Sequence, residues 1–132
     1  MSFLPRLATV LCLVTAACEQ PAPLPPETAT LTVCEASRQL LGTRVRVSGE
    51  FNGTSYETAP RTIVLGTGEL CSERGSGVVF AEVYDTAEIT KIANLRPRGK
   101  RPVTPGSTIT LEGTITKIED GRFAHLSNAI VR

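Results

Sequence analysis

The residue types that could carry out chemistry are few in this chain of 132 residues, which has one histidine and four cysteines. Nucleophilic catalysis needs a base within reach of the nucleophile, usually a histidine that an acid orients. His125 stands between Ala124 and Leu126 with no such motif around it, a context typical of a packed or solvated side chain. We therefore predict that the protein is not an enzyme.

Other candidate groups fall near predicted turns, where solvated carboxylates are ordinary. These carboxylates are Asp85, Glu88, Glu119 and Asp120. The pairs Gly66-x-Gly68 and Gly75-x-Gly77 have phosphate-loop spacing, but neither is followed by Lys-Ser or Lys-Thr. We interpret them as turn glycines and expect no cofactor. One histidine also supplies too few ligands for a metal site, so none is expected.

The first 17 residues have the layout of a secretory signal. Arg6 precedes an apolar run, Leu7 to Ala17, which is shorter than the roughly 20 residues that a membrane-spanning helix needs. The run ends in TAAC, which resembles the lipobox of bacterial lipoprotein signals. The resemblance implies removal of residues 1–17 and acylation of Cys18, which would anchor the protein in a membrane. Ordinary signal cleavage near the same place is the alternative.

The residue after Cys18 is Glu19 rather than aspartate. By resemblance to lipoprotein sorting in Gram-negative bacteria, this implies the cell envelope, at the outer membrane and facing the periplasm. Residues 18–29 hold four of the nine prolines and no apolar periodicity. Such a stretch favours a semi-rigid, extended linker, although a disordered N-terminus has the same composition.

Residues 30–132 have the length of one domain with its own core. The chain has 14 basic and 13 acidic residues, and loss of residues 1–17 removes only Arg6. The mature chain is then formally neutral. Proteins that neutralise several phosphates usually carry a basic surface, so a nucleic-acid partner is not expected.

A helix is predicted at the start of the domain. Thr32 and Glu35 have the spacing of a capping box, in which each side chain satisfies a backbone N–H of the other. Apolar residues then recur at helical spacing up to Gly42, a plausible helix stop. They are Val33, Ala36, Leu40 and Leu41.

Five strands and a second helix follow. Period-two alternation or short apolar runs predict strands over 43–51, 61–66, 77–84, 107–118 and 122–132. In the fourth strand, isoleucines, a leucine and Gly113 occupy one face, and threonines and Glu112 the other. A short helix is predicted over 86–95, and Asp120-Gly121 is a strong hairpin signal.

Five strands with a helix between the third and fourth predict a mainly β fold, a five-stranded OB-fold barrel with an extra N-terminal helix. Gly49 and Gly113, inside strands, suit the sharp bends of a small barrel. An open meander covered by a helix is the alternative. From Leu31 to Arg132, the pieces VCEASRQLLGT, RVRVSGEF and ITLEGTITK…NAIVR resemble exported OB-fold modules of bacterial envelopes, related in shape to tRNA-anticodon-binding-like domains.

This resemblance implies a disulfide between Cys34, on the leading helix, and Cys71, after the second strand. The cysteine count agrees, since these two remain as a pair once Cys18 is acylated. A redox-active pair would more often read Cys-x-x-Cys. We expect a structural disulfide.

Two features could form a ligand surface. Phe80 and Tyr84 share one face of the third strand, on the side where OB-folds bind ligands; alternatively, Phe80 packs under the leading helix. The second feature is a basic loop, RPRGKR, which is also explained as a solvated charge run. Its basic residues are Arg96, Arg98, Lys100 and Arg101.

Three functions are compatible with these features. The first is a non-catalytic, lipid-anchored binding module of the envelope that contacts another protein or an envelope component. The second is an oligonucleotide- or oligosaccharide-binding module that uses the two aromatic residues and the basic loop, and the third is an enzyme. The short Asp-Gly hairpin weighs against the second, because many OB-fold binders use that loop to hold their ligand.

Overall fold

The computed structural model describes residues 23–55, 61–92, 94–95, 97, 99–100, 103–104 and 106–132. The predicted signal peptide and Cys18 lie outside these residues. The described chain contains no helix long and apolar enough to cross a membrane.

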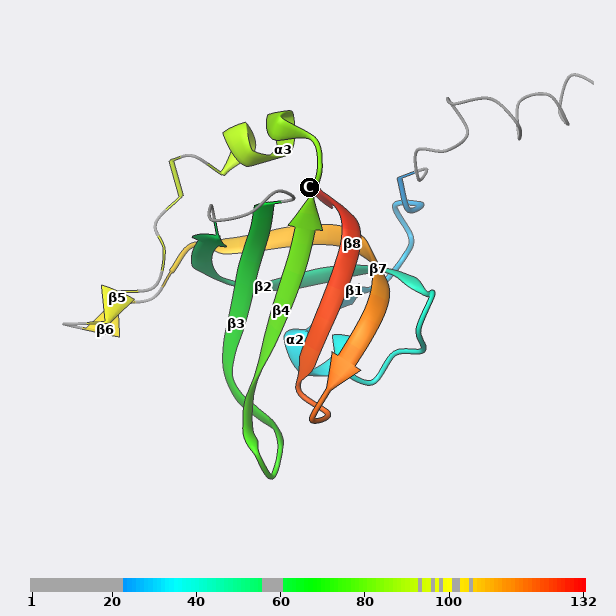
Figure 1. Ribbon diagram of the computed structural model, residues 1–132, viewed down its shortest axis with the longest axis vertical. Helices are drawn as coiled ribbons and strands as arrows, with labels where there is room; N and C mark the ends of the chain where they lie inside the picture. The colour runs from blue at the N-terminus through cyan, green and yellow to red at the C-terminus, as the bar shows by residue number, and fades with distance from the viewer. Residues whose placement is uncertain are drawn as a thin grey trace, which may run out of the picture.

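Five long strands close into a barrel (Figure 1). They are β2 (Arg44–Ser55), β3 (Arg61–Ser72), β4 (Gly75–Val83), β7 (Thr108–Glu119) and β8 (Phe123–Val131). The strand order is β2-β3-β4-β8-β7, and β7 pairs back onto β2. Only the β4–β8 contact within this barrel is parallel. This is the predicted OB-fold barrel, and the open meander is excluded.

Short elements complete the described fold. Helix α3 (Thr86–Lys91) lies between β4 and β7, as predicted. A two-residue strand, β1 (Thr30–Leu31), pairs parallel to β2. In the segment predicted as a loop, β5 (Gly99–Lys100) pairs with β6 (Val103–Thr104).

The barrel interior follows the predicted alternation. Val45 and Val47 on β2 and Leu111 and Ile115 on β7 are at most 4% exposed. These aliphatic side chains join those of the other strands in one core cluster. Burial of apolar surface, worth about 25 cal/mol per Å², is therefore what selects the register of each strand.

The bend of β2 explains the predicted role of Gly49. Here β2 passes from pairing with β7 to pairing with β3. A Cβ atom at Gly49 would lie 2.8 Å from Val33 and 3.1 Å from the carbonyl oxygen of Gly66. A side chain at this position would displace the helix that packs against the barrel.

That helix, α2 (Val33–Ala36), begins with the predicted capping box: Glu35 N–H donates to Thr32 Oγ1, and Thr32 N–H donates to Glu35 Oε1. It ends earlier than predicted. Leu40 and Leu41 are 81% and 64% exposed, so the prediction that they continue an apolar helix face is wrong. After α2 the chain continues in turns, with Arg38 N–H bonded to Glu35 O and Gln39 N–H to Ala36 O, and Gly42 N–H bonds to Ile115 O of β7.

The disulfide predicted between Cys34 and Cys71 is present, with a Cα–Cα distance of 4.9 Å. It joins α2 to the C-terminal end of β3. Gly77, on the adjacent strand β4, leaves the space for this bond, because a Cβ atom there would overlap Cys71 Sγ. The disulfide therefore fixes the helix against the barrel.

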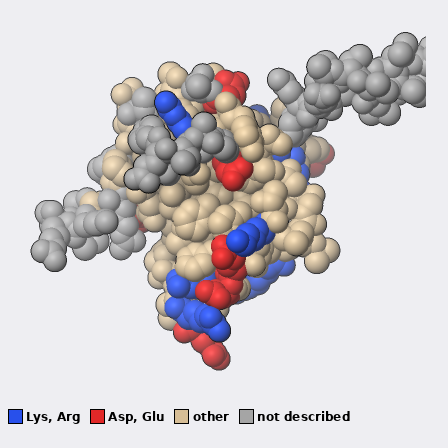
Figure 2. All heavy atoms as spheres, in the orientation of Figure 1, with Lys and Arg blue, Asp and Glu red and all other residues tan. Residues whose placement is uncertain are grey.

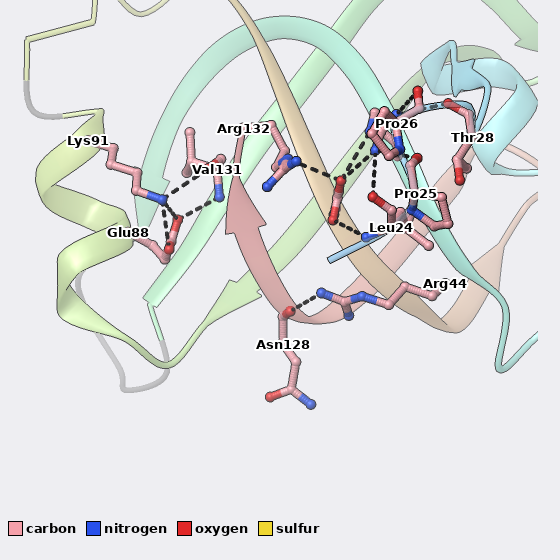
Figure 3. A network of polar contacts seen from close by, with 12 residues as sticks. Leu24, Pro25, Pro26, Thr28, Arg44, Glu88, Lys91, Asn128, Val131 and Arg132 are labelled. Carbon is pink, nitrogen blue, oxygen red and sulfur yellow. Dashed lines mark hydrogen bonds and ion pairs between the residues drawn. The ribbon is translucent and has the colours of Figure 1, made fainter. Parts of the chain in front are cut away.

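Residues 24–28 of the proline-rich linker are bound to the barrel by a contact that composition does not predict. The guanidinium group of Arg46, on β2, donates to four linker carbonyls at 2.8 to 3.4 Å (Figure 3). The acceptors belong to Leu24, Pro25, Pro26 and Thr28. We call this arrangement, with the carboxylate described next, the linker clasp.

Glu112, on β7, completes the clasp. Its carboxylate accepts from Arg46 Nη2 at 2.9 Å, from Leu24 N–H at 3.1 Å, and pairs with Arg132 at 3.2 Å. Burial alone would raise the pKa of Glu112, but these hydrogen bonds and the two positive charges hold it below its usual value. Glu112 keeps the alternation predicted for this strand, yet it is 0% exposed, because the linker lies over it.

Candidate binding face on β3, β4 and β8

Alternation along β4 produces an outward face that carries an aromatic ring. Val79, Ala81 and Val83 are buried in the core, at 0 to 3% exposure. Phe80, between them, is half-buried on the outside of the barrel. The small aliphatic residues of β4 therefore face the core, and Phe80 faces outward.

Strand pairing brings further side chains beside Phe80. Val64 on β3 and His125 on β8 are its direct partners in the two neighbouring strands. The rings of Phe80 and His125 stack with centroids 5.0 Å apart and an interplanar angle of 25°. Phe123 lies 6.1 Å from Phe80 in a tilted arrangement. The alternative in which Phe80 packs under the leading helix is wrong, because these rings are its partners instead.

We define the binding face as the outward side chains at the centre of these three strands. Its members are Val64, Val78, Phe80, Phe123 and His125. All five are half-buried, so each ring or methyl group is held by its neighbours while part of it contacts solvent. Figure 2, in the orientation of Figure 1, shows uncharged atoms across the middle of this side, with charged groups above them and a larger group of charges below, toward the β3–β4 hairpin.

Polar groups surround the rings. Glu119 Oε1 and His125 Nε2 form a hydrogen bond of 2.7 Å. This contact, with the nearby charge of Lys117, holds the pKa of Glu119 below its usual value. The second aromatic ring, Phe123, has a cation beside it: the guanidinium group of Arg122 lies 4.1 Å from the ring centroid, within cation–π range. The face thus has an apolar centre and a rim with both signs of charge.

Tyr84 lies beyond the end of β4 and is 61% exposed. Its hydroxyl donates to Glu82 Oε2 at 3.1 Å, which raises the pKa of Tyr84. Tyr84 is four positions after Phe80, which corresponds to about 13 Å along a strand. Tyr84 lines a separate groove with Pro23 and Asp85, so the two predicted aromatic residues do not form one patch.

The predicted basic loop is largely outside the described residues. Arg96, Arg98 and Arg101 are among those not described. Lys100 pairs through its backbone with Val103 in the β5–β6 hairpin, and its side chain is not described. All four basic side chains of this loop therefore lie outside what the structure describes.

The face presents contact surface rather than an assembled set of reacting groups. His125 is oriented by Glu119, as a catalytic base would be, but the group stacked on its ring is Phe80. Among the described residues, no three side chains of the types that bind metals come together. Phe123 and His125 were not predicted as part of a site; the signal for them is the β4–β8 pairing, which the sequence does not reveal.

No protein-family model and no curated protein matches this sequence. Solved structures do. One is a protein named as an aspartyl-tRNA synthetase of Leishmania major Friedlin: TM-score 0.52, 16% identity, 84% of this chain and 22% of that chain. This chain thus spans about a fifth of that protein's length.

Two further structures are less similar. One is named as a nucleic acid-binding lipoprotein from Klebsiella pneumoniae, with TM-score 0.45, 15% identity, and coverage of 83% of this chain and 99% of that one. The other is an OBody bound to hen egg-white lysozyme, with TM-score 0.45, 14% identity, and coverage of 83% and 98%. The synthetase comparison, at 16% identity and a TM-score of 0.52, supports the fold alone: the chain is a mainly β protein built on an OB-fold barrel.

Proposed function

We propose that this protein is a non-catalytic binding module, anchored by a lipid on Cys18 in the bacterial cell envelope, at the outer membrane and facing the periplasm. The TAAC sequence before position 19, and Glu19 itself, support the anchor and its location. The Cys34–Cys71 disulfide is consistent with an oxidising compartment. In this proposal the binding face contacts another envelope protein or component.

The observation that carries the proposal is the composition of the binding face. An apolar, aromatic centre inside a polar rim is the arrangement found at protein–protein contacts. Phe80 and Phe123 supply a large contact area, and the neighbouring rings already restrict the rotamers of both side chains. Little side-chain entropy is therefore lost on binding. The face also lies on the strands that other OB-folds use for ligands.

Site-specific photo-crosslinking tests the proposal. A photo-reactive amino acid at Val64, the half-buried partner of Phe80 on β3, should give a discrete adduct with an envelope component in cells of the source bacterium. Glu35, on α2 and away from the face, is the matched control position. Phe80→Ala in the Val64-labelled protein should reduce the adduct. Adducts of equal yield at both positions, or an adduct at Val64 that Phe80→Ala leaves unchanged, would contradict the proposal.

The alternative is an oligonucleotide- or oligosaccharide-binding module, and the exposed ring of Tyr84 together with the Phe80–His125 stack favours it. Stacking is worth about 1–3 kcal/mol for each base, which with two rings reaches only about millimolar to sub-millimolar affinity. Glu82 and Glu119 near the rings oppose a polyanion. We therefore expect a labelled oligonucleotide to bind no tighter than sub-millimolar at physiological salt. Micromolar binding that Phe80→Ala weakens would establish this alternative.

A further inference from the structure

Two leucines stand exposed at a turn that the barrel holds rigid. Leu40 and Leu41 are 81% and 64% exposed in the segment between α2 and β2. Thr43 N–H donates to Leu40 O at 3.2 Å, and Gly42, with φ +87°, takes the left-handed position that such a turn requires. Gly42 N–H also donates to Ile115 O at 2.7 Å. The leucines are thus presented by a fixed backbone.

The charged residues nearest to this turn in the sequence are basic. From residue 37 to residue 49 the chain has three arginines and no acidic residue. Arg46 is occupied in the linker clasp, and Arg44 donates to Asn128 O. Arg38, two residues before Leu40, is exposed. Glu35, the nearest acidic residue in sequence, accepts a hydrogen bond from Thr32 N–H. An exposed apolar tip beside an exposed arginine, Arg38, suits contact with an anionic lipid surface, to which each basic residue adds attraction.

The linker clasp places the N-terminal chain beside this turn. Glu112, which holds Leu24, and Ile115, which holds Gly42, are three residues apart on β7. That separation is about 10 Å along a strand. Figure 1 shows the linker and the segment between α2 and β2 on the same side of the barrel, at the right of the view. The binding face is formed by other strands, β3, β4 and β8, which face the viewer.

Chain length then limits the distance to an anchor. Cys18 is six residues before Leu24, so even a fully extended chain spans at most about 20 Å between them. Because this step depends on the anchor at Cys18, it rests on the proposed function. A barrel held this close to the bilayer, by the side that carries the leucines, brings the turn to the lipid surface.

We propose that the Leu40–Leu41 turn is a membrane-docking element. The two leucines enter the interfacial region of the bilayer that holds the anchor, and Arg38 contacts anionic headgroups. A single point of attachment would leave the domain free to rotate about its linker. The clasp and the docked turn together give it one orientation, with the binding face left free of the membrane.

The test uses the mature chain, residues 18–132, coupled through its Cys18 thiol to a maleimide lipid in anionic vesicles. The protein has no tryptophan, so Leu41→Trp introduces a unique fluorophore at the turn. Leu70→Trp is the matched control, because Leu70 is also highly exposed, at 77% against 64% for Leu41, but lies at the β3–β4 hairpin. Brominated lipids should quench most of the fluorescence at position 41 and little at position 70. Arg38→Glu in the Leu41→Trp protein should reduce the quenching.

Equal quenching at the two positions, or none at position 41, would overturn the proposal. A blue shift at position 41 in lipid-free solution, dependent on protein concentration, would assign the leucines to a contact between copies and also overturn it. Because the lipid is attached chemically, the result does not depend on whether cells acylate Cys18. Failure of the docking element and failure of the proposed anchor are therefore distinguishable.

Discussion

Replacing Arg46 by methionine should both destabilise the barrel and release the linker. Arg46 is 11% exposed and Glu112 0% exposed at the side chain, so the pair is shielded from water. Removing one partner of a buried ion pair costs about 3–5 kcal/mol, because the remaining charge stays buried without compensation. Arg132 remains 3.2 Å from the carboxylate, so we expect the lower end, about 3 kcal/mol.

Arg74→Met is the matched control. Arg74 pairs with Asp120 at a similar distance, 3.1 Å, but the two side chains are 70% and 46% exposed. Exposed ion pairs contribute about 0–1 kcal/mol. Urea unfolding followed by circular dichroism should therefore show a large loss of stability for Arg46→Met and almost none for Arg74→Met.

The linker gives a second, independent measurement. Leu24 N–H donates to Glu112, and four linker carbonyls accept from Arg46. In Arg46→Met, hydrogen exchange of residues 24–28 and protease cleavage there should accelerate, while the barrel amides stay protected. A stability loss equal to that of the Arg74 variant, or a linker that stays protected, would refute the clasp.

Three further predictions concern the fold and its pH dependence. Reduction of the Cys34–Cys71 disulfide, which closes a sequence separation of 37, should lower stability by up to about 4 kcal/mol in the chain-entropy model; thiol counts on denatured protein with Cys18 replaced check the bond, and two free thiols would exclude it. Gly77→Ala should destabilise strongly or prevent the disulfide, whereas Gly68→Ala, with nothing within 4 Å of its Cβ position, should be nearly neutral; similar melting temperatures would contradict the packing described. The pKa of Glu112 is lowered by folding, so the stabilisation from its carboxylate is complete above about pH 4.5 and is lost as the pH falls. Glu112→Gln should therefore flatten the acid limb of the curve of stability against pH. An unchanged acid limb would show that the clasp carboxylate does not titrate there.

Local patterns in the sequence were enough to predict the barrel. Period-two alternation reports directly which residues face the core, and all of Val45, Val47, Leu111 and Ile115 are buried. The Thr32 capping box is likewise a contact between neighbours in sequence. Interactions of this kind are encoded within a few residues, so a single sequence reveals them.

The errors arise where a distant segment decides the outcome. Leu41 fits helical spacing, but α2 ends at Ala36 and Gly42 pairs with β7. The alternation that includes Glu112 does not reveal that the linker covers this residue. The partners of Phe80 were missed for the same reason, since the parallel β4–β8 pairing that brings His125 beside it joins strands far apart in the chain. No local pattern records these contacts.

The most direct test of the central proposal, a lipid-anchored envelope module, is the intact mass of the protein extracted from membranes of the source bacterium. The account predicts a chain that begins at Cys18, carries acyl chains on that residue, and loses them in Cys18→Ser. Two or more acyl chains are enough for stable attachment, at about 0.8 kcal/mol for each buried CH₂. A soluble, unmodified chain, or one that begins elsewhere, would contradict it.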